Sequence, residues 1–93
     1  MQKAIWKISK KPAFQGLGTW IIGETDFNEN EKITFCAKVF DEPSKYGIGG
    51  NGRISKLDIR LGNEVLTQYD RGWSIEPTEE VIPIYEGILE SYN

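Results

Sequence analysis

The residues best suited to bind a ligand lie in one glycine-rich stretch, DEPSKYGIGGNGRISKLDIR, at positions 41–60. Three glycines have the spacing G-x-G-x-x-G: Gly47, Gly49 and Gly52. Three cationic side chains stand near them in the sequence: Lys45, Arg53 and Lys56. Glycines allow backbone N–H groups to approach an anion closely, and neighbouring cations add to the attraction. The stretch therefore has the residue types of an anion-binding loop.

The same spacing also arises for purely structural reasons. The dinucleotide fingerprint requires a helix after the glycines, whereas RISKLDIR continues as a strand. Protein kinases place a glycine loop between strands, but this chain lacks their D-F-G and H-R-D elements. Glycine also supplies positive φ in a long, bulged hairpin. Anion binding and a structural hairpin both stay open.

A second candidate is the segment YDRGW, Tyr69 to Trp73. Asp-Arg-Gly is typical of a turn, and the flanking rings would clamp a planar group while Arg71 binds a phosphate or carboxylate. The alternative is a turn whose Tyr69 and Trp73 pack into the core. Trp6 and Trp20, which lie within predicted strands, are expected in the core.

The residues needed for common catalytic chemistry are missing. The chain has no histidine, so Ser-His-Asp or Cys-His catalysis and the usual zinc sites are excluded. The single cysteine, Cys36, lies in the apolar run ITFCAKVF and is expected to be a packed side chain. DFNENE, residues 26–31, lacks the spacing and the glycine of a calcium loop. We expect no enzymatic activity, no catalytic residue, no cofactor and no metal site.

The first three quarters of the chain have the two-residue period of strands. AIWKIS, TWIIGE, KITFCAKVF, RISKLDIRL and VLTQYD are predicted strands, with a final short strand at Trp73 to Ile75. KKPAFQGLG is predicted to be a loop because it contains proline and glycines. In KITFCAKVF the residues expected on one face are Ile33, Phe35, Ala37 and Val39. In RISKLDIRL the residues expected on the polar face are Ile54, Lys56, Asp58 and Arg60.

The carboxyl-terminal segment PTEEVIPIYEGILESYN has helical spacing of its apolar residues. Thr78 is a candidate N-cap, but Pro83 is tolerated only in a first turn, so the regular helix is expected to begin nearer Pro83. The predicted fold is α+β: an antiparallel β-sheet of about five strands with one C-terminal amphipathic helix packed on it. A dimer partner or a bound molecule is expected to cover the other face of the sheet.

Length and charge limit the class of protein further. Ninety-three residues form a single domain, residues 1–93. The net charge of −3 provides no basic field for duplex nucleic acid, although lysines gather in residues 1–11 and glutamates in residues 74–93. The sequence has no membrane-spanning apolar run and no secretory signal. We therefore expect a location in the cytoplasm.

The core FCAKVFDEPSKYGIGGNGRISKLDIR, followed by YDRGW and an acidic helix, resembles a family of short, uncharacterised phage and prophage proteins of Gram-positive bacteria. The resemblance covers roughly Phe35 to Trp73. The loop GIGGNGR is about a residue longer here than in the family pattern. The resemblance implies a phage origin, with the cytoplasm of a bacterial host as location, and supplies no catalytic residues.

Three binding functions follow from these patterns. The first is a counter-defence inhibitor that binds a bacterial immune protein, such as a CRISPR effector, through an exposed patch at Tyr46 and Ile48. The second is a dimeric sponge for a nucleotide signal, and the third is a single-stranded nucleic-acid-binding protein. The predicted binding residues across the three are Lys45, Tyr46, Ile48, Arg53, Lys56, Arg60, Tyr69, Arg71 and Trp73.

Overall fold

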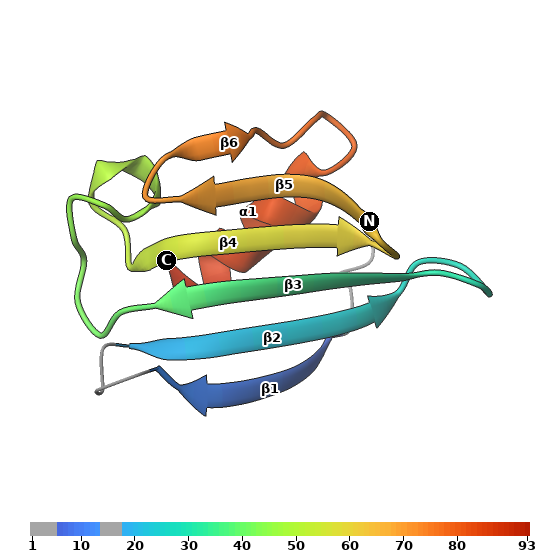
Figure 1. The fold of residues 1–93 in the computed structure, drawn as a ribbon, viewed down its shortest axis with the longest axis horizontal. Coiled ribbons are helices and arrows are strands. Elements are labelled where there is room, and N and C mark those ends of the chain that lie inside the picture. The colour runs from blue at the N-terminus through green and yellow to red at the C-terminus, as the bar shows by residue number, and fades with distance from the viewer. Residues whose placement is uncertain (1–5, 14–17) are drawn as a thin grey trace.

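A six-stranded antiparallel sheet and one helix make up the fold, which is therefore α+β as predicted (Figure 1). The computed structural model describes residues 6–13 and 18–93. The elements are β1 Lys7–Pro12, β2 Thr19–Asp26, β3 Lys32–Val39, β4 Ile54–Leu61, β5 Glu64–Asp70, β6 Trp73–Ile75 and α1 Ile82–Tyr92. The strands follow one another in space in chain order, β1-β2-β3-β4-β5-β6. Each of the six strands overlaps a segment predicted as a strand, in agreement with the predicted sheet of about five strands.

The core lies between α1 and one face of the sheet (Figure 1). Alternate residues of the central strands are buried on this face: Ile21, Ile33, Phe35, Ala37, Val39, Leu57, Ile59, Thr67 and Tyr69. Val81 and Ile88 are buried from the helical side. Because strand side chains alternate between faces, the period of two in KITFCAKVF placed its apolar residues correctly.

The helix begins where proline allows it to begin. Val81 is the N-cap, and Pro83 stands in the first turn, where its missing N–H leaves no hydrogen bond unmade. The amides of Val81 and Ile82 donate hydrogen bonds to the backbone carbonyl of Thr78. Thr78 therefore lies in the turn before the helix and is not its N-cap. The predicted start near Pro83 is confirmed.

Two local predictions of the strand pattern are wrong. Ile54, expected on the polar face beside Lys56, is fully buried, because Ser55 is an extra residue between the pairs Lys38↔Lys56 and Val39↔Ile54. Such a bulge returns the next residue to the opposite face. Lys10, Lys11 and Pro12 were expected in the loop KKPAFQGLG but belong to β1, which pairs with β2. Proline is tolerated there because β1 is an edge strand. Residues 14–17 of that predicted loop, and Ala4 and Ile5 of the predicted strand AIWKIS, lie outside the described residues.

One close approach in the core requires glycine. Gly23 lies directly opposite Phe35, and a Cβ on Gly23 would overlap the Phe35 ring. The same ring meets Trp6 edge to face at 5.0 Å between centroids. Among the described residues no helix is long and apolar enough to cross a membrane.

Gly23→Ala is expected to lower the free energy of unfolding by about 1–3 kcal/mol, because the methyl group displaces the buried Phe35 ring. Gly87→Ala is the matched control: its Cβ meets nothing within 4 Å, and alanine in a helix is favoured over glycine by about 0.5–1 kcal/mol. Urea unfolding of both variants should give shifts of opposite sign. Two shifts of the same sign would contradict the packing described for Gly23.

Candidate functional site

The loop between β3 and β4 is held by contacts within the chain. Asn93 fastens it from the end of α1: its Oδ1 accepts the Ile54 amide at 3.0 Å, and its Nδ2 donates to the Ile48 carbonyl at 3.3 Å. The Tyr69 hydroxyl donates to the Tyr46 carbonyl at 2.9 Å. Ile48 itself is buried, with 5% of its surface exposed. The predicted exposed patch at Tyr46 and Ile48 is therefore wrong for Ile48, which anchors the loop in the core.

The glycines of this loop have structural causes. A Cβ on Gly47 would overlap the Gly52 carbonyl, and a Cβ on Gly52 would overlap the Asn93 side chain. Gly49 and Gly50 have φ of 83° and 81°, which glycine adopts without strain. The glycine spacing is thus explained by a bulged hairpin connection without an anion.

Three predicted residues lie at the surface of this loop or beside it. Tyr46 is 47% exposed, and the Lys45 ammonium lies 5.1 Å from its ring centroid. Arg53 is half-buried just before β4, and its carbonyl accepts the Phe40 amide at 2.9 Å. These three residues belong to the connection between the end of β3 and the start of β4, which Figure 1 shows at one end of the sheet.

The two aromatic rings of YDRGW pack against each other and do not form the walls of a cleft. Tyr69 is buried, and its ring meets Trp73 edge to face at 5.0 Å between centroids. Trp73 also meets Tyr85 of α1 at 5.5 Å. This arrangement leaves no gap for a planar group between Tyr69 and Trp73. Arg71 has φ of 57° in the turn, and its Nε lies 3.6 Å from Asp70 Oδ1.

The sheet separates the remaining predicted residues. Tyr69 lies opposite Leu57 on the face covered by α1, whereas Lys56 and Arg60 lie on the other face. Lys56 Nζ is 3.9 Å from Asp70, and Arg60 is 3.5 Å from Asp58. The aromatic pair and these cations therefore do not form one nucleotide site within a single chain.

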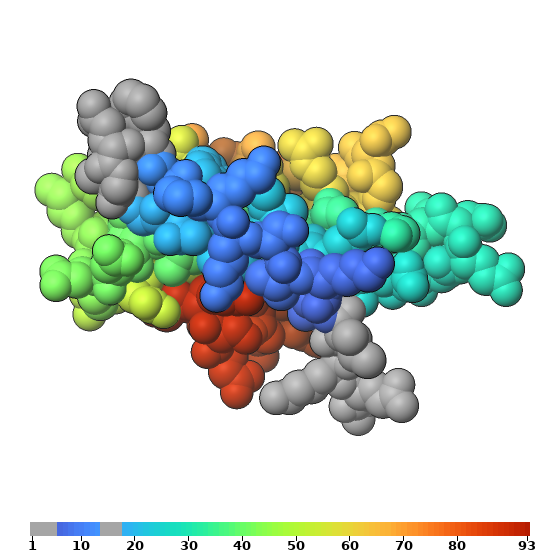
Figure 2. All heavy atoms as spheres, turned by 90° about the horizontal axis from the view of Figure 1, so that it is seen from below, coloured from blue at the N-terminus to red at the C-terminus, as the bar shows by residue number. Residues whose placement is uncertain are grey.

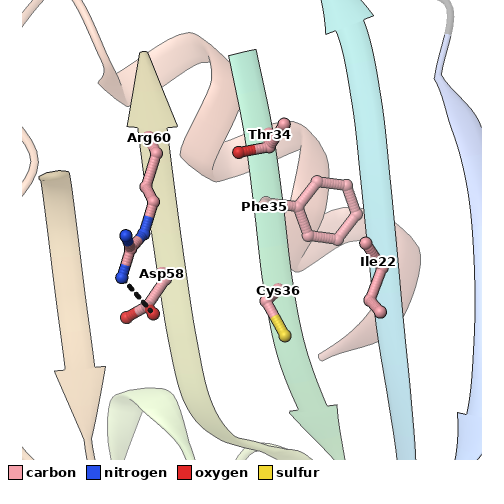
Figure 3. Close-up of a pocket in the computed structure, with 6 residues that line it drawn as sticks. All are labelled: Ile22, Thr34, Phe35, Cys36, Asp58 and Arg60. Atoms are coloured by element: carbon pink, nitrogen blue, oxygen red, sulfur yellow. Dashed lines mark ion pairs between the residues drawn. The ribbon is translucent and has the colours of Figure 1, made fainter. Parts of the chain in front are cut away.

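The face of the sheet opposite α1 is uncovered by any described element (Figure 1). We call it the outer face. The register of β1 to β5 places the following residues on it: Lys7, Ser9, Lys11, Trp20, Ile22, Glu24, Asp26, Lys32, Thr34, Cys36, Lys38, Lys56, Asp58, Arg60, Gln68 and Asp70. A depression of about 260 Å³ on this face is lined by Ile22, Thr34, Phe35, Cys36, Asp58 and Arg60. Figure 3 shows these residues, with the Asp58–Arg60 ion pair on β4 and Cys36 on the neighbouring β3.

One row of outer-face residues crosses four strands near the loop end of the sheet. Register places Lys11 opposite Trp20, Trp20 opposite Lys38, and Lys38 opposite Lys56. We call these four residues the basic row. The Lys38 ammonium lies 6.0 Å from the Trp20 ring centroid and 5.5 Å from that of Phe40. The row thus combines three cations with the partly exposed Trp20 ring, and the partly exposed Phe40 ring lies beside Lys38.

The charges of the basic row are poorly neutralised. Lys38 and Lys56 stand directly opposite each other, an arrangement of like charges that destabilises a sheet. In the described part of the chain no carboxylate lies within 4 Å of the Lys38 or Lys11 ammonium. Lys56 has only Asp70, which also lies beside Arg71. At the far end of the outer face, by contrast, Lys32 is hydrogen-bonded to Glu24.

Sequence reasoning missed three members of this site: Lys11, Trp20 and Lys38. Trp20 was expected in the core, but it is only half-buried and lies on the outer face. The position of Lys38 could be predicted from the sequence, because the two-residue period that buries Ala37 and Val39 places Lys38 on the opposite face of β3. Cross-strand register, which brings Lys38 between Trp20 and Lys56, is not readable from one strand.

Removing the hydroxyl that fastens the loop gives a local stability test. Tyr69→Phe is expected to lower the free energy of unfolding by about 0.5–1.5 kcal/mol, because the Tyr46 carbonyl loses its donor. Tyr46→Phe removes a hydroxyl from an exposed ring and should change stability by less than about 0.5 kcal/mol. Equal effects in urea unfolding would contradict the loop anchor.

The thiol of Cys36 gives a pH-dependent test of the outer face. Burial, and then the nearby Asp58 carboxylate, raise the pKa of Cys36 above its ordinary value. Because the thiolate is the reactive form, the rate of alkylation should reach half its maximum at a higher pH in the folded chain than in urea. Mass spectrometry reads this directly, since the chain has one cysteine. The same midpoint in both states would contradict the described environment.

Comparison with known proteins gives a family but no function. No curated protein and no solved structure matches the chain. A family model described as "Domain of unknown function (DUF7678)" matches residues 19–93, from the first residue of β2 to Asn93. The match includes Trp20, Lys38 and Lys56 and leaves Lys11 outside. The chain therefore belongs to the DUF7678 family, a domain of unknown function.

Proposed function

We propose that this protein is a non-enzymatic binding protein that takes single-stranded nucleic acid on the outer face of its sheet. The observation that carries the proposal is the basic row, in which Lys38 and Lys56 face each other beside the Trp20 and Phe40 rings. A ligand with repeated negative charge would relieve the repulsion between the two ammonium groups. A single strand supplies such charge together with bases that stack on aromatic rings.

The dimensions of the row suit a short piece of a flexible strand. Neighbouring strands of a sheet lie roughly 4.8 Å apart, so the three steps from Lys11 to Lys56 span about 14 Å. A strand that crosses the sheet along this row would meet a cation, a ring and two further cations in turn. The depression beside Cys36 adjoins the row and would accept a base or sugar.

The rest of the surface opposes duplex nucleic acid. The far end of the sheet carries mostly acidic side chains: Glu24, Asp26, Glu29, Glu31 and Glu64. The net charge is −3, and the basic row lies at the opposite, loop end of the sheet. A rigid duplex would extend beyond this small area onto acidic surface, whereas a flexible strand can stay on the row.

Two other functions stay predictions. A phage origin and inhibition of a bacterial immune protein would use the exposed Tyr46 and Lys45, which remain available without Ile48. A nucleotide sponge would need a second chain to bring Trp73 near phosphate-binding cations, because one chain places them on opposite faces. The cations without close carboxylates on the outer face favour the nucleic-acid proposal over both.

Fluorescence anisotropy with labelled oligothymidylate, oligouridylate and a duplex tests the proposal. Trp20→Ala should weaken single-strand binding about 5- to 150-fold, the loss of one base-stacking contact. Lys38→Ala should reduce the slope of log affinity against log salt by about 0.7, the loss of one phosphate contact. Lys7→Ala is the matched control, since Lys7 lies on the same face at the opposite end of β1.

The outcomes separate the alternatives. On an oligonucleotide that spans a single basic row, Lys7→Ala should leave affinity and salt slope close to those of the unmodified chain. Absence of single-strand binding at low salt, or equal losses in Lys7→Ala and Lys38→Ala, would overturn the proposal. Thermal unfolding of each variant checks that Trp20→Ala retains the fold, and Lys38→Ala provides the decisive result if it does not.

A further inference from the structure

The sheet ends in two edges whose outer sides have no partner in the described part of the chain. β1 and β6 are the first and last strands of the order, and each pairs with one neighbour only. Figure 2 looks onto the β1 edge, where the blue atoms of β1 face the viewer beside the red atoms of α1. An open edge offers backbone N–H and C=O groups to another strand.

The two edges carry opposite charge. The β1 edge has three exposed lysines: Lys7, Lys10 and Lys11. Glu76 follows β6 directly, and Glu79 and Glu80 lie in the segment that joins β6 to α1 at the same edge (Figure 1). Within the described chain none of these six side chains has an ion-pair partner within 4 Å. The edges are therefore electrostatically complementary.

Exposed apolar side chains also gather at the two edges. The described residues include five large exposed hydrophobic side chains, and three of them are Ile8 on β1 and Trp73 and Ile75 on β6. Ile8 lies opposite Gly23 and Trp73 lies opposite Tyr69, so both are on the face that α1 covers. An edge-to-edge contact would bring Ile8 of one copy near Trp73 of the next.

The even number of strands allows the same edge-to-edge contact to repeat from one copy to the next. In an antiparallel sheet of six strands the first and last strands run in opposite directions. A second copy translated across the sheet therefore places its β1 antiparallel to β6, with both outer faces on the same side. We propose that the protein associates head to tail with further copies of itself, β6 and its flanking glutamates contacting the lysine-rich β1 of the next copy.

The association should be weak and open-ended. β6 has only three residues, so few hydrogen bonds can form at each junction. A head-to-tail contact leaves a free edge at both ends of any assembly, so growth does not stop at a dimer. This inference does not need the proposed function, but if both hold, adjacent outer faces form a continuous platform and nucleic-acid binding is cooperative along the strand.

Sedimentation velocity of the full chain over a range of concentrations at low salt tests the inference. The weight-average mass should rise above the 10.6 kDa of one chain, continue past that of a dimer, and fall when salt is added. Two charge-reversed variants are needed, Lys7→Glu with Lys10→Glu on β1, and Glu76→Lys with Glu79→Lys beside β6. Each variant alone should lose the association, because its two edges then have like charge.

A chain that carries all four charge-reversing substitutions provides the decisive test. It should associate again, because opposite charges once more face each other at every head-to-tail junction. Monomers at all concentrations, a plateau at a dimer, or no recovery in the fourfold variant would each overturn the inference. These outcomes are independent of oligonucleotide binding, so failure here leaves the proposed function standing, and failure of binding leaves the association standing.

Discussion

Docking of α1 on one face of the sheet is the contact on which the rest of the structure depends. Its buried side, centred on Ile88 with the preceding Val81, covers the row of Phe35, Leu57 and Ile59 and completes the core. The helix also ends in Asn93, whose side chain binds the Ile54 amide and the Ile48 carbonyl. The same docking thus closes the core and fixes the loop that precedes β4.

The covered face also determines the arrangement of the outer face. The register between β3 and β4 is unbroken from the pair Ile33↔Leu61 to the pair Lys38↔Lys56, and the bulge at Ser55 follows that last pair. The same register that buries Ala37 opposite Leu57 therefore places Lys38 opposite Lys56 on the uncovered face. Because a single helix covers only one side, the outer face must carry polar residues, and these are distributed as a basic end and an acidic end rather than evenly.

The sequence predicts elements better than it predicts this site. The period of two in KITFCAKVF and the position of Pro83 correctly predicted the buried face of β3 and the start of α1. The bulge at Ser55 and the burial of Ile48 involve contacts with a residue far along the chain. Asn93 bonds the Ile54 amide, 39 residues away, and the Ile48 carbonyl, 45 residues away. No local sequence pattern predicts these contacts. Trp20 was misjudged because a tryptophan within an apolar strand is equally compatible with either face until the neighbouring strand is known.

A titration of the isotope-labelled protein with oligothymidylate, followed by amide and tryptophan indole chemical shifts, tests the central claim most directly. The account predicts the largest shifts at Lys11, Trp20, Lys38 and Lys56, with little change at Tyr85 and Ile88 on the helical side. Shifts concentrated at Tyr46 or around Trp73, or no shifts at low salt, would contradict binding on the outer face.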